Sequence, residues 1–324
     1  MKVVVTGATS FIGIAVIKCL LEQGHEVVAV VRPHSANLGK LEDACGERQG
    51  NLKVFELPLA ELDRLPRMLD NCILEKNCRL HGDEETCSAD AWLHLGWDGV
   101  GSAGRSDVVV QEQNIGNTLR AINVAYELGV SRFLFTGSQA EYGIHRDTIT
   151  EESDCQPVSE YGKAKLVVSE RAGQLCQNLG MEYIHTRIFS VYGPGDHPWS
   201  LVNTCLDTWT AGEIMSLGEC TQQWNFLYID DAADAIALLL TKPEVPSGIY
   251  NVAGSDTRVL REFVEEMYRL CGSRGSFQYG LRAPNAEGPA SLIPDISKLE
   301  QATGWKPQVD FSDGIKRMLK LRQD

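Results

Sequence analysis

Residues 3–13 read VVVTGATSFIG and join a short apolar run to a glycine-containing turn and the start of an amphipathic segment. The valines predict a buried strand, and residues 11–24, FIGIAVIKCLLEQG, predict a helix. Gly7 permits the tight turn between them, and Gly13 lets the helix pack closely on the strand. Main-chain amides at the start of such a helix bind phosphate. The sequence therefore predicts a phosphate-binding turn, formed by Gly7, Thr9, Ser10, Phe11, Ile12 and Gly13.

The rest of the chain repeats this alternation of apolar runs and helix-like stretches. Further strands are expected at 25–33, 51–58, 91–97, 130–138 and 181–193, and further helices at 115–129 and from about 157 onwards. Continuous apolar strands separated by helices predict βαβ units, because such strands are buried on both faces of a parallel sheet. The sequence therefore predicts the α/β class, with a doubly wound parallel sheet.

The alternation of apolar runs and helix-like stretches becomes less regular after about residue 195, where loops rich in proline and glycine separate the helices. This change predicts a sheet domain at 1–190 and a smaller C-terminal α/β lobe at 191–324. The last elements of the sheet domain, at about 225–252, are expected to interleave with the lobe. Such a lobe would lie over the carboxyl edge of the sheet, where open α/β sheets bind their ligands.

Composition and charge narrow the classes of protein and partner. The 324 residues are 43% hydrophobic and 23% charged, which is ordinary for a globular chain. A net charge of −14 argues against nucleic acid or an anionic membrane as the main partner.

The ten cysteines form no CxxC pair, which predicts reduced thiols and no metal site. Residues 70–90 hold three of them in a polar, patternless stretch, which predicts a surface excursion. The N-terminus lacks a basic leader, so we expect a cytoplasmic protein.

The end of the second expected strand distinguishes two dinucleotide cofactors. A carboxylate at that point binds the ribose 2′-hydroxyl of NAD, whereas this chain has Val31 followed by Arg32. A guanidinium suits the 2′-phosphate of NADP. Ser35 and Lys40 are further donors nearby. The residues favour NADP(H), with NAD(H) as the alternative, although a solvated charge at a strand end would also explain Arg32.

Three residues form a candidate catalytic set. Ser138 follows the strand at 130–138, while Tyr161 and Lys165 lie one helical turn apart on the next helix. Hydride chemistry at a carbonyl or alcohol needs a group that exchanges the proton of the oxygen, and a phenol with a pKa near 10 is reluctant to do so. A neighbouring ammonium favours the phenolate, and a serine hydroxyl can orient the substrate. We expect Tyr161 to act as acid and base and Ser138 to orient the substrate. We expect Lys165 to lower the pKa of Tyr161 and to bind the cofactor.

The ordered motifs TGATSFIG, FLFTGSQAEYG, YGKAK, RIFSVYGPG, QQWNFLYIDDAADAI and LEQATGWKPQVDFSDGI make the chain similar to the extended short-chain dehydrogenase/reductase superfamily. The branch that it resembles comprises nucleotide-sugar epimerases, dehydratases and ketoreductases. The resemblance runs nearly end to end and implies a Rossmann domain that binds NAD(P), with a smaller substrate-binding lobe. It also implies the Ser–Tyr–Lys site and cofactor contacts at Leu59, Leu95, Gly96 and Trp97, with Asn114 as a structural residue.

Several positions depart from the pattern of this superfamily. Sugar 4,6-dehydratases carry an Asp-Glu pair after the serine or threonine, where this chain has Gln139 and Ala140, so we reject dehydration. Ser190 replaces an asparagine, and Trp224 replaces an arginine that reaches the phosphate of the sugar nucleotide. Arg282 matches a second phosphate-binding arginine. The resemblance thus implies substrate contacts at Gln139, Ser190, Trp224 and Arg282. We assign no role to three histidines. His94 lies in an apolar strand and is expected to be a satisfied core or edge residue, and the sequence places no carboxylate or serine partner beside His145 or His185.

Taken together, the sequence favours an NADP(H)-dependent oxidoreductase acting on a nucleoside-diphosphate sugar, most simply a reductase of a 4-keto sugar. Arg32 motivates the reductase, since an epimerase retains its cofactor and its relatives carry the carboxylate that binds NAD. The alternative is an NAD-dependent nucleotide-sugar 4-epimerase. Further alternatives are a reductase of a non-nucleotide ketone and a non-catalytic NADP-binding sensor. By analogy with the superfamily we expect a homodimer formed by the helices of Asn114 and Tyr161.

Overall fold

The computed structural model describes residues 1–75, 88–282 and 291–322. Its centre is a seven-stranded sheet with the order β10-β6-β5-β4-β1-β2-β3. All neighbouring strands in it run parallel, and Val4 of β1, for example, pairs with Val28 and Trp92 on its two sides. This confirms the predicted α/β class. The strands are β1 (Lys2–Thr6), β2 (Glu26–Val31), β3 (Leu52–Glu56), β4 (Ala91–His94), β5 (Arg132–Ser138), β6 (Glu182–Ile188) and β10 (Gly248–Val252).

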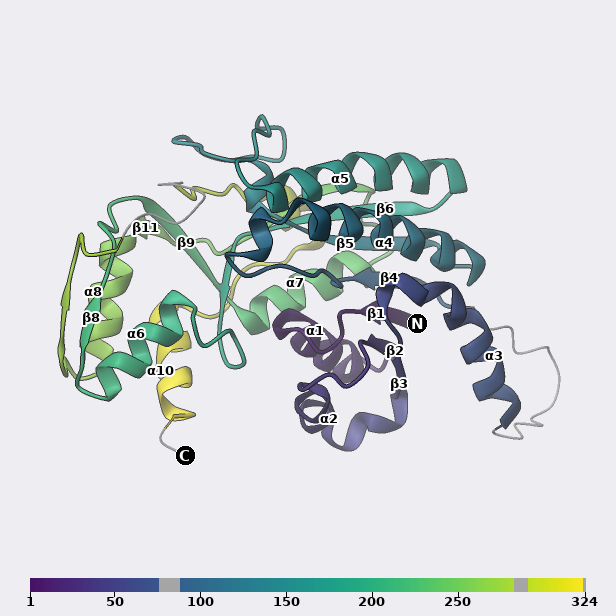
Figure 1. The fold of residues 1–324 in the computed structure, drawn as a ribbon, viewed down its shortest axis with the longest axis horizontal. Helices are drawn as coiled ribbons and strands as arrows, with labels where there is room; N and C mark the ends of the chain where they lie inside the picture. The colour runs from purple at the N-terminus through teal and green to yellow at the C-terminus, as the bar shows by residue number, and fades with distance from the viewer. Residues whose placement is uncertain (76–87, 283–290, 323–324) are drawn as a thin grey trace.

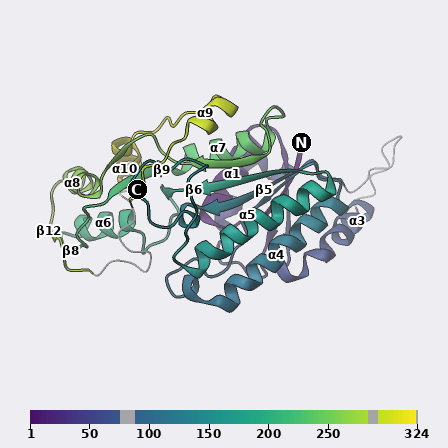
Figure 2. The ribbon, with the colours of Figure 1, turned by 90° about the horizontal axis from the view of Figure 1, so that it is seen from above.

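Helices cover both faces of this sheet (Figures 1 and 2). One face packs against α1 (Phe11–Glu22), α2 (Leu38–Cys45) and α7 (Ile229–Thr241). The other face packs against α3 (Leu65–Glu75), α4 (Val108–Glu127) and α5 (Glu160–Leu179). In Figure 2, α4 and α5 lie side by side.

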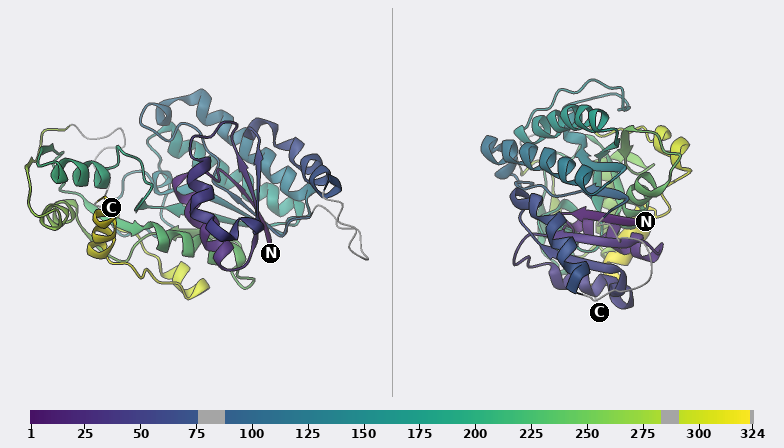
Figure 3. Two further views of the ribbon diagram at one scale, coloured as in Figure 1. Left: turned by 90° about the horizontal axis from the view of Figure 1, so that it is seen from below. Right: turned by 90° about the vertical axis from the view of Figure 1, so that its right-hand side faces the viewer.

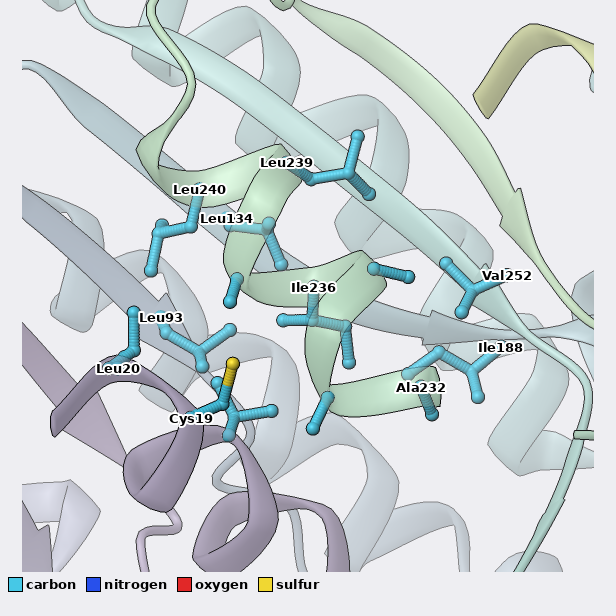
Figure 4. Close-up of a cluster of buried hydrophobic side chains, with 14 of the residues drawn as sticks. Cys19, Leu20, Leu93, Leu134, Ile188, Ala232, Ile236, Leu239, Leu240 and Val252 are labelled. Atoms are coloured by element: carbon cyan, nitrogen blue, oxygen red, sulfur yellow. The ribbon is translucent and has the colours of Figure 1, made fainter. Parts of the chain in front are cut away.

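The two-residue period of a strand sends alternate side chains to opposite layers. Val3 and Val5 of β1 pack among the residues of α1 and α7, whereas Val4 packs among those of α4 and α5. Figure 4 shows Ile236 and Leu239 of α7 in the first of these layers, where they meet side chains from α1 and the strands. Each fully buried aliphatic side chain contributes about 1.5–3 kcal/mol. The sheet therefore holds its carboxyl edge rigidly.

A smaller lobe lies beside the sheet domain (Figures 1 and 3). Its core joins Trp209 of α6, Phe263 of α8 and Phe311 of α10. The chain returns from this lobe to the main sheet through α7 and β10. The strands of the lobe are β7 (Ser190–Tyr192), β9 (Gln223–Tyr228) and β11 (Thr257–Val259) in one sheet, and β8 (Ile214–Ser216) and β12 (Ser276–Gln278) in another. The remaining helices are α6 (Leu201–Thr210), α8 (Leu260–Leu270), α9 (Ser297–Thr303) and α10 (Phe311–Lys320).

Two expectations about the elements need correction. The single strand expected at 181–193 is two strands, β6 and β7, which belong to different sheets. Ile188 at the end of β6, Phe189 after it and Tyr192 of β7 are all buried, so the apolar run continues across the break and does not reveal it. The first part of the stretch at 70–90 belongs to α3, whose apolar residues Leu65 and Leu69 lie upstream of the polar stretch and pack on the sheet. Residues 76–87 lie outside the described residues.

Within the described ranges, no helix combines the length and apolar character needed to cross a lipid bilayer.

Candidate active site

A cavity of about 1030 Å³ lies at the carboxyl edge of the main sheet. Its walls include the residues that directly follow β1, β2 and β4, the last residues of β5 and the first turns of α5. The lobe closes it with residues of β7, α6 and β9. The parallel sheet and the lobe thus bring together segments that are far apart in the sequence.

The glycine turn after β1 forms one wall of this cavity. Gly7 has a φ of +73°, and a Cβ atom there would lie 2.6 Å from the main-chain nitrogen of Gly96. The Ser10 hydroxyl accepts a hydrogen bond from the Gly13 amide at 3.1 Å and so caps α1. Gly13 does not line the cavity, because it packs under the turn, where a Cβ would lie 2.5 Å from the Gly7 carbonyl oxygen. The predicted residues that line the cavity are Gly7, Thr9, Ser10, Phe11 and Ile12.

The residues after β2 bring positive charge to the cavity. Arg32 lines it, with a side chain that is 77% exposed and 3.8 Å from the Asp98 carboxylate. Lys40 lines it as well. Ser35 does not line it, because its hydroxyl bonds that of Thr9 at 2.9 Å and so supports the glycine turn from behind.

The segments after β3 and β4 form another wall of the cavity. Leu59, Leu95, Gly96 and Trp97 all line the cavity. The Trp97 indole N–H donates to the Gln111 side-chain oxygen at 2.9 Å, which fixes the ring. The side chain of Asn114 holds the main chain of Asp98, the residue after Trp97. Its Nδ2 donates to the Asp98 carbonyl at 2.9 Å, and its Oδ1 accepts from the Asp98 amide at 3.0 Å. The role expected of Asn114 as a structural residue fits these contacts.

The three candidate catalytic residues line the same cavity. Ser138 ends β5, and Tyr161 and Lys165 lie in the first turns of α5. That helix begins at Ser159, whose hydroxyl accepts from the Gly162 amide at 3.1 Å. The Lys165 ammonium lies 5.6 Å from the centre of the Tyr161 ring. The spacing of four residues therefore places the cation beside the phenol.

Lys165 is almost fully buried. Its ammonium donates to the Thr136 carbonyl at 2.7 Å and lies 3.8 Å from the centre of the Trp97 ring. Burial lowers the pKa of Lys165 to about 7, the charge of Glu141 opposes this, and Arg105 adds to it. The lysine thus changes its charge near neutral pH, which suits a group that takes part in proton exchange.

Arg105 is a neighbour of Tyr161 that sequence reasoning missed. Its guanidinium carbon lies 4.3 Å from the centre of the Tyr161 ring. The residue sits in the glycine- and serine-rich stretch GVGSAGRSD, residues 99–107, which carries no pattern that would point to the phenol. A second cation thus faces the aromatic ring from a separate loop.

A buried ionic cluster lies behind Ser138, and the sequence analysis missed it too. The Glu141 carboxylate lies 2.9 Å from His185 Nε2 and accepts from Arg187 Nε at 2.9 Å. His185 therefore has the carboxylate partner that the sequence did not reveal. His94 is a satisfied core residue, as expected, between the hydroxyls of Thr6 and Thr118 at 2.6 and 3.2 Å. Burial lowers the pKa of His94 to about 3.

The residues expected to contact the substrate divide into two groups. Ser190 and Trp224 line the cavity. No described residue accepts a hydrogen bond from the buried Nε1 of Trp224. Gln139 and Arg282 do not line it. Gln139 begins a short 3-10 helix (η4, Gln139–Glu141) that carries it off the cavity wall, and Arg282 is an exposed residue of the lobe whose main-chain amide bonds Leu217. The PNAEG motif that follows Arg282 lies outside the described residues.

A metal does not fit this site as well as a dinucleotide does. Over the described parts of the chain, histidine, cysteine and acidic residues form no group of three that could hold a metal ion. The cavity instead offers a glycine turn at a helix N-terminus, cations after β2 and a phenol beside two cations. These are the donors and proton-exchanging groups that a nicotinamide dinucleotide and its substrate require.

Comparisons with known proteins agree with this assignment. The model of the NAD dependent epimerase/dehydratase family matches residues 3–253, which is more than half of the chain. An uncharacterized UDP-glucose epimerase of Bacillus subtilis (strain 168) is 24% identical, over 97% of this chain and 96% of its own length. A UDP-glucuronate 4-epimerase of Thermodesulfobacterium geofontis is also 24% identical, over 99% of this chain and 95% of its own.

Solved structures share the whole fold. The UDP-glucuronic acid 4-epimerase of Bacillus cereus, in complex with UDP-glucuronic acid and NAD, superposes with a TM-score of 0.84 at 21% identity, covering 100% of this chain and 99% of its own. The UDP-glucose 4-epimerase of Thermus thermophilus, in complex with NAD, gives a TM-score of 0.82 at 21% identity, with 99% and 98% covered.

Proposed function

The chain belongs to the NAD dependent epimerase/dehydratase family, and we propose that it is an NAD-dependent 4-epimerase of a nucleoside-diphosphate sugar. The observation that carries the proposal is that Ser138, Tyr161 and Lys165 line one cavity with the glycine turn after β1. The named relatives with 4-epimerase activity favour this function over the reduction that the sequence analysis preferred.

The residues at the carboxyl edge of the sheet fit the dinucleotide. The first residues of α1 line the cavity, and their main-chain amides would hold the phosphates, with Gly7 keeping the turn close to Gly96. Leu95 and Trp97 would lie along it on the side of β4. Bound NAD supplies the hydride acceptor and donor for C4 of the sugar.

The proton of the sugar hydroxyl is the part of the reaction that the chain itself handles. Tyr161 Oη takes this proton when the alcohol is oxidised and returns it when the carbonyl is reduced. The positive charges of Lys165 and Arg105 near the ring favour the phenolate and so assist this exchange. Ser138 lines the same cavity and would hold the substrate oxygen by a hydrogen bond.

The lobe would bind the rest of the sugar nucleotide. We propose residues 191–324 as the substrate-binding part, apart from β10, which belongs to the main sheet, and α7, which packs against it. Trp224 and Ser190 are its proposed substrate contacts, since both line the cavity. The indole of Trp224 offers a flat face for a base or sugar and an N–H donor.

An NADP(H)-dependent 4-keto sugar reductase is the second candidate, and one observation favours it. Arg32 and Lys40 line the cavity after β2, where a carboxylate would be expected in an enzyme selective for NAD. A reductase consumes NADPH stoichiometrically, whereas an epimerase leaves the cofactor unchanged after each cycle.

One experiment separates these functions. The purified protein is incubated with UDP-glucose or UDP-glucuronic acid and NAD, and the sugars are followed by proton NMR together with the absorbance of NADH. The epimerase predicts accumulation of the C4 epimer without net change in NADH. Consumption of NADPH with a 4-keto sugar, and no epimer, would replace the epimerase with the reductase. No turnover under either condition would contradict both.

A further inference from the structure

A buried carboxylate lies directly behind the proposed catalytic serine. The side chain of Glu141 is fully buried, and its carboxylate accepts a hydrogen bond from the Ser138 amide at 2.8 Å. His185 and Arg187 of β6 reach the same carboxylate, each at 2.9 Å. None of these three charged or titratable side chains lines the cavity. The cluster therefore acts on the site through Ser138 and not by touching the substrate.

The end of β5 is shaped around this cluster. A Cβ atom on Gly137 would lie 2.3 Å from the Glu141 carboxylate and 2.3 Å from His185 Nε2. The strand therefore needs glycine at this position, because the carboxylate and the imidazole already occupy the space of a side chain. Such close fitting leaves Ser138 little freedom to move relative to Glu141.

The same strand end is also held by Lys165. The ammonium donates to the Thr136 carbonyl at 2.7 Å, two residues before the amide that Glu141 binds. The stretch from Thr136 to Ser138 is thus tied by a cation at one end and an anion at the other. These two charges also act on each other, because Glu141 raises the pKa of Lys165 against the effect of burial.

Other charged and titratable groups also affect the pKa values of Lys165 and Glu141. The charge of Arg105 lowers the lysine pKa further, the Tyr161 ring centre lies 5.6 Å from the ammonium, and the charge of Lys165 adds to the lowering of the His94 pKa. Burial alone would raise the pKa of Glu141, but His185 and Arg187 hold it below its usual value, so the carboxylate stays ionised. Glu141 is therefore ionised, and its charge favours the ammonium form of Lys165.

We propose that Glu141 is a positioning residue of the active site, which anchors the Ser138 main chain and places a buried negative charge at the strand end that Lys165 also holds. His185 and Arg187 hold its carboxylate in place. The expected effect on turnover rests on the proposed function, whereas the effect on the charge of Lys165 does not.

The charge effect is tested by NMR on protein that carries ¹³C-labelled lysine, with Lys165 assigned by the Lys165→Arg variant. Glu141→Gln keeps an oxygen for the Ser138 amide but removes the charge, and it is predicted to move the Lys165 titration to lower pH by about one unit. The control is Glu151→Gln, a carboxylate that accepts from the Asn251 amide at 2.8 Å. It is predicted to leave the titration unchanged. Equal midpoints in both variants would overturn the charge assignment.

The anchoring effect is tested with Glu141→Asp, which keeps the charge but withdraws it from the Ser138 amide. The variant is predicted to lose about tenfold in kcat, with the affinity for NAD and the Lys165 titration unchanged. This variant also tests the proposal if Glu141→Gln does not fold, as judged by circular dichroism. A kcat equal to that of the wild type would contradict the anchoring.

The outcomes separate the two proposals. Turnover in the wild type with unaltered behaviour of both Glu141 variants contradicts only the role of Glu141. Absence of turnover in the wild type contradicts the proposed function, and the Lys165 titration in Glu141→Gln then still decides whether Glu141 supplies the charge.

Discussion

Lys165 combines deep burial with a charge, and the two have opposite consequences. Burial removes the hydration of the ammonium, which costs folding free energy and lowers the pKa to about 7. The same burial places the ammonium 3.8 Å from the Trp97 ring and 5.6 Å from that of Tyr161, where water screens it little. Its field therefore acts strongly on the phenol. Functional sites often contain groups of this kind, which a protein optimised for stability alone would avoid.

Replacing Lys165 by methionine should therefore stabilise the protein, by about 2 kcal/mol at pH 6.5. The folded pKa lies below the unfolded one, so the unfolded chain binds more protons between about pH 7 and 10.5, and wild-type stability rises with pH over that range. The gain from Lys165→Met should accordingly be larger at pH 6.5 than at pH 9.5.

Urea unfolding at the two pH values measures this gain. Lys163→Met, at a half-exposed position of the same helix, is the matched control and should change stability by less than about 0.5 kcal/mol. A loss of stability in Lys165→Met at pH 6.5 would show that the ammonium is a structural contact and not a strained functional charge.

The end of β5 is the element that organises the site, because it carries Ser138 and receives both Lys165 and Glu141. The strand itself was predictable from its apolar run. Its glycine was not assigned a role, since the contact that requires it joins Glu141 to His185, 44 residues away. The short helix η4 then places Glu141 behind the strand and Gln139 off the cavity wall.

Gly137→Ala should destabilise the protein by about 2 kcal/mol, because the added methyl group would force the carboxylate and imidazole apart. Gly116→Ala on the exposed face of α4 is the control. A Cβ there meets nothing within 4 Å, so this variant should be more stable by about 1 kcal/mol. Equal unfolding free energies of the two variants in urea would refute the close fit at β5.

The helix α4 bears on the expected homodimer. Ile115, Leu119, Ile122 and Tyr126 form an apolar stripe along this helix, at a spacing compatible with an interface. In the structure, the first three pack against the chain's own core, and only Tyr126 is largely exposed. The stripe therefore gives the dimer no support, and the homodimer stays a prediction that sedimentation equilibrium would test.

The whole molecule carries a net charge of −14 and yet would bind an anionic dinucleotide. Among the described residues that line the cavity, the lysines and arginines are Arg32, Lys40 and Lys165. Two of them follow β2 and one lies by the phenol. The binding of phosphate therefore depends on a few local cations and on the amides of α1, against the field of the rest of the protein.

Arg32→Ala should lower the affinity for NADP by about tenfold if the guanidinium binds a 2′-phosphate, while the affinity for NAD should change less than about threefold. Calorimetric titrations with both cofactors measure this difference. Arg64→Ala, an exposed arginine outside the cavity, is the control. An equal loss of affinity for NADP and NAD would show that Arg32 does not distinguish the 2′-phosphate from the 2′-hydroxyl. That result would favour the epimerase further.

The sequence predicted the sheet, the glycine turn and the Ser138–Tyr161–Lys165 set, because each has a local pattern or a fixed spacing. It missed Arg105 and the partnership of Glu141 with His185, because such contacts join distant segments and leave no periodic signal. It also favoured NADP mainly from Arg32, an exposed charge, with Ser35 and Lys40 as further donors, whereas the structural neighbours named above bind NAD. Motifs with a local pattern could thus be predicted from the sequence, whereas contacts between distant segments could not.

The central claim is that Tyr161 exchanges the proton of the sugar hydroxyl. Tyr161→Phe is predicted to lower epimerisation by about 10² or more, because the ring remains but the hydroxyl is lost. Tyr126→Phe, at the exposed end of α4, should retain full turnover. The decisive measurement is the turnover of Tyr161→Phe set against its affinity for NAD, determined by calorimetry. The account predicts lost turnover with nearly unchanged affinity, and turnover within a few fold of the wild type, or an equal loss of both, would contradict it.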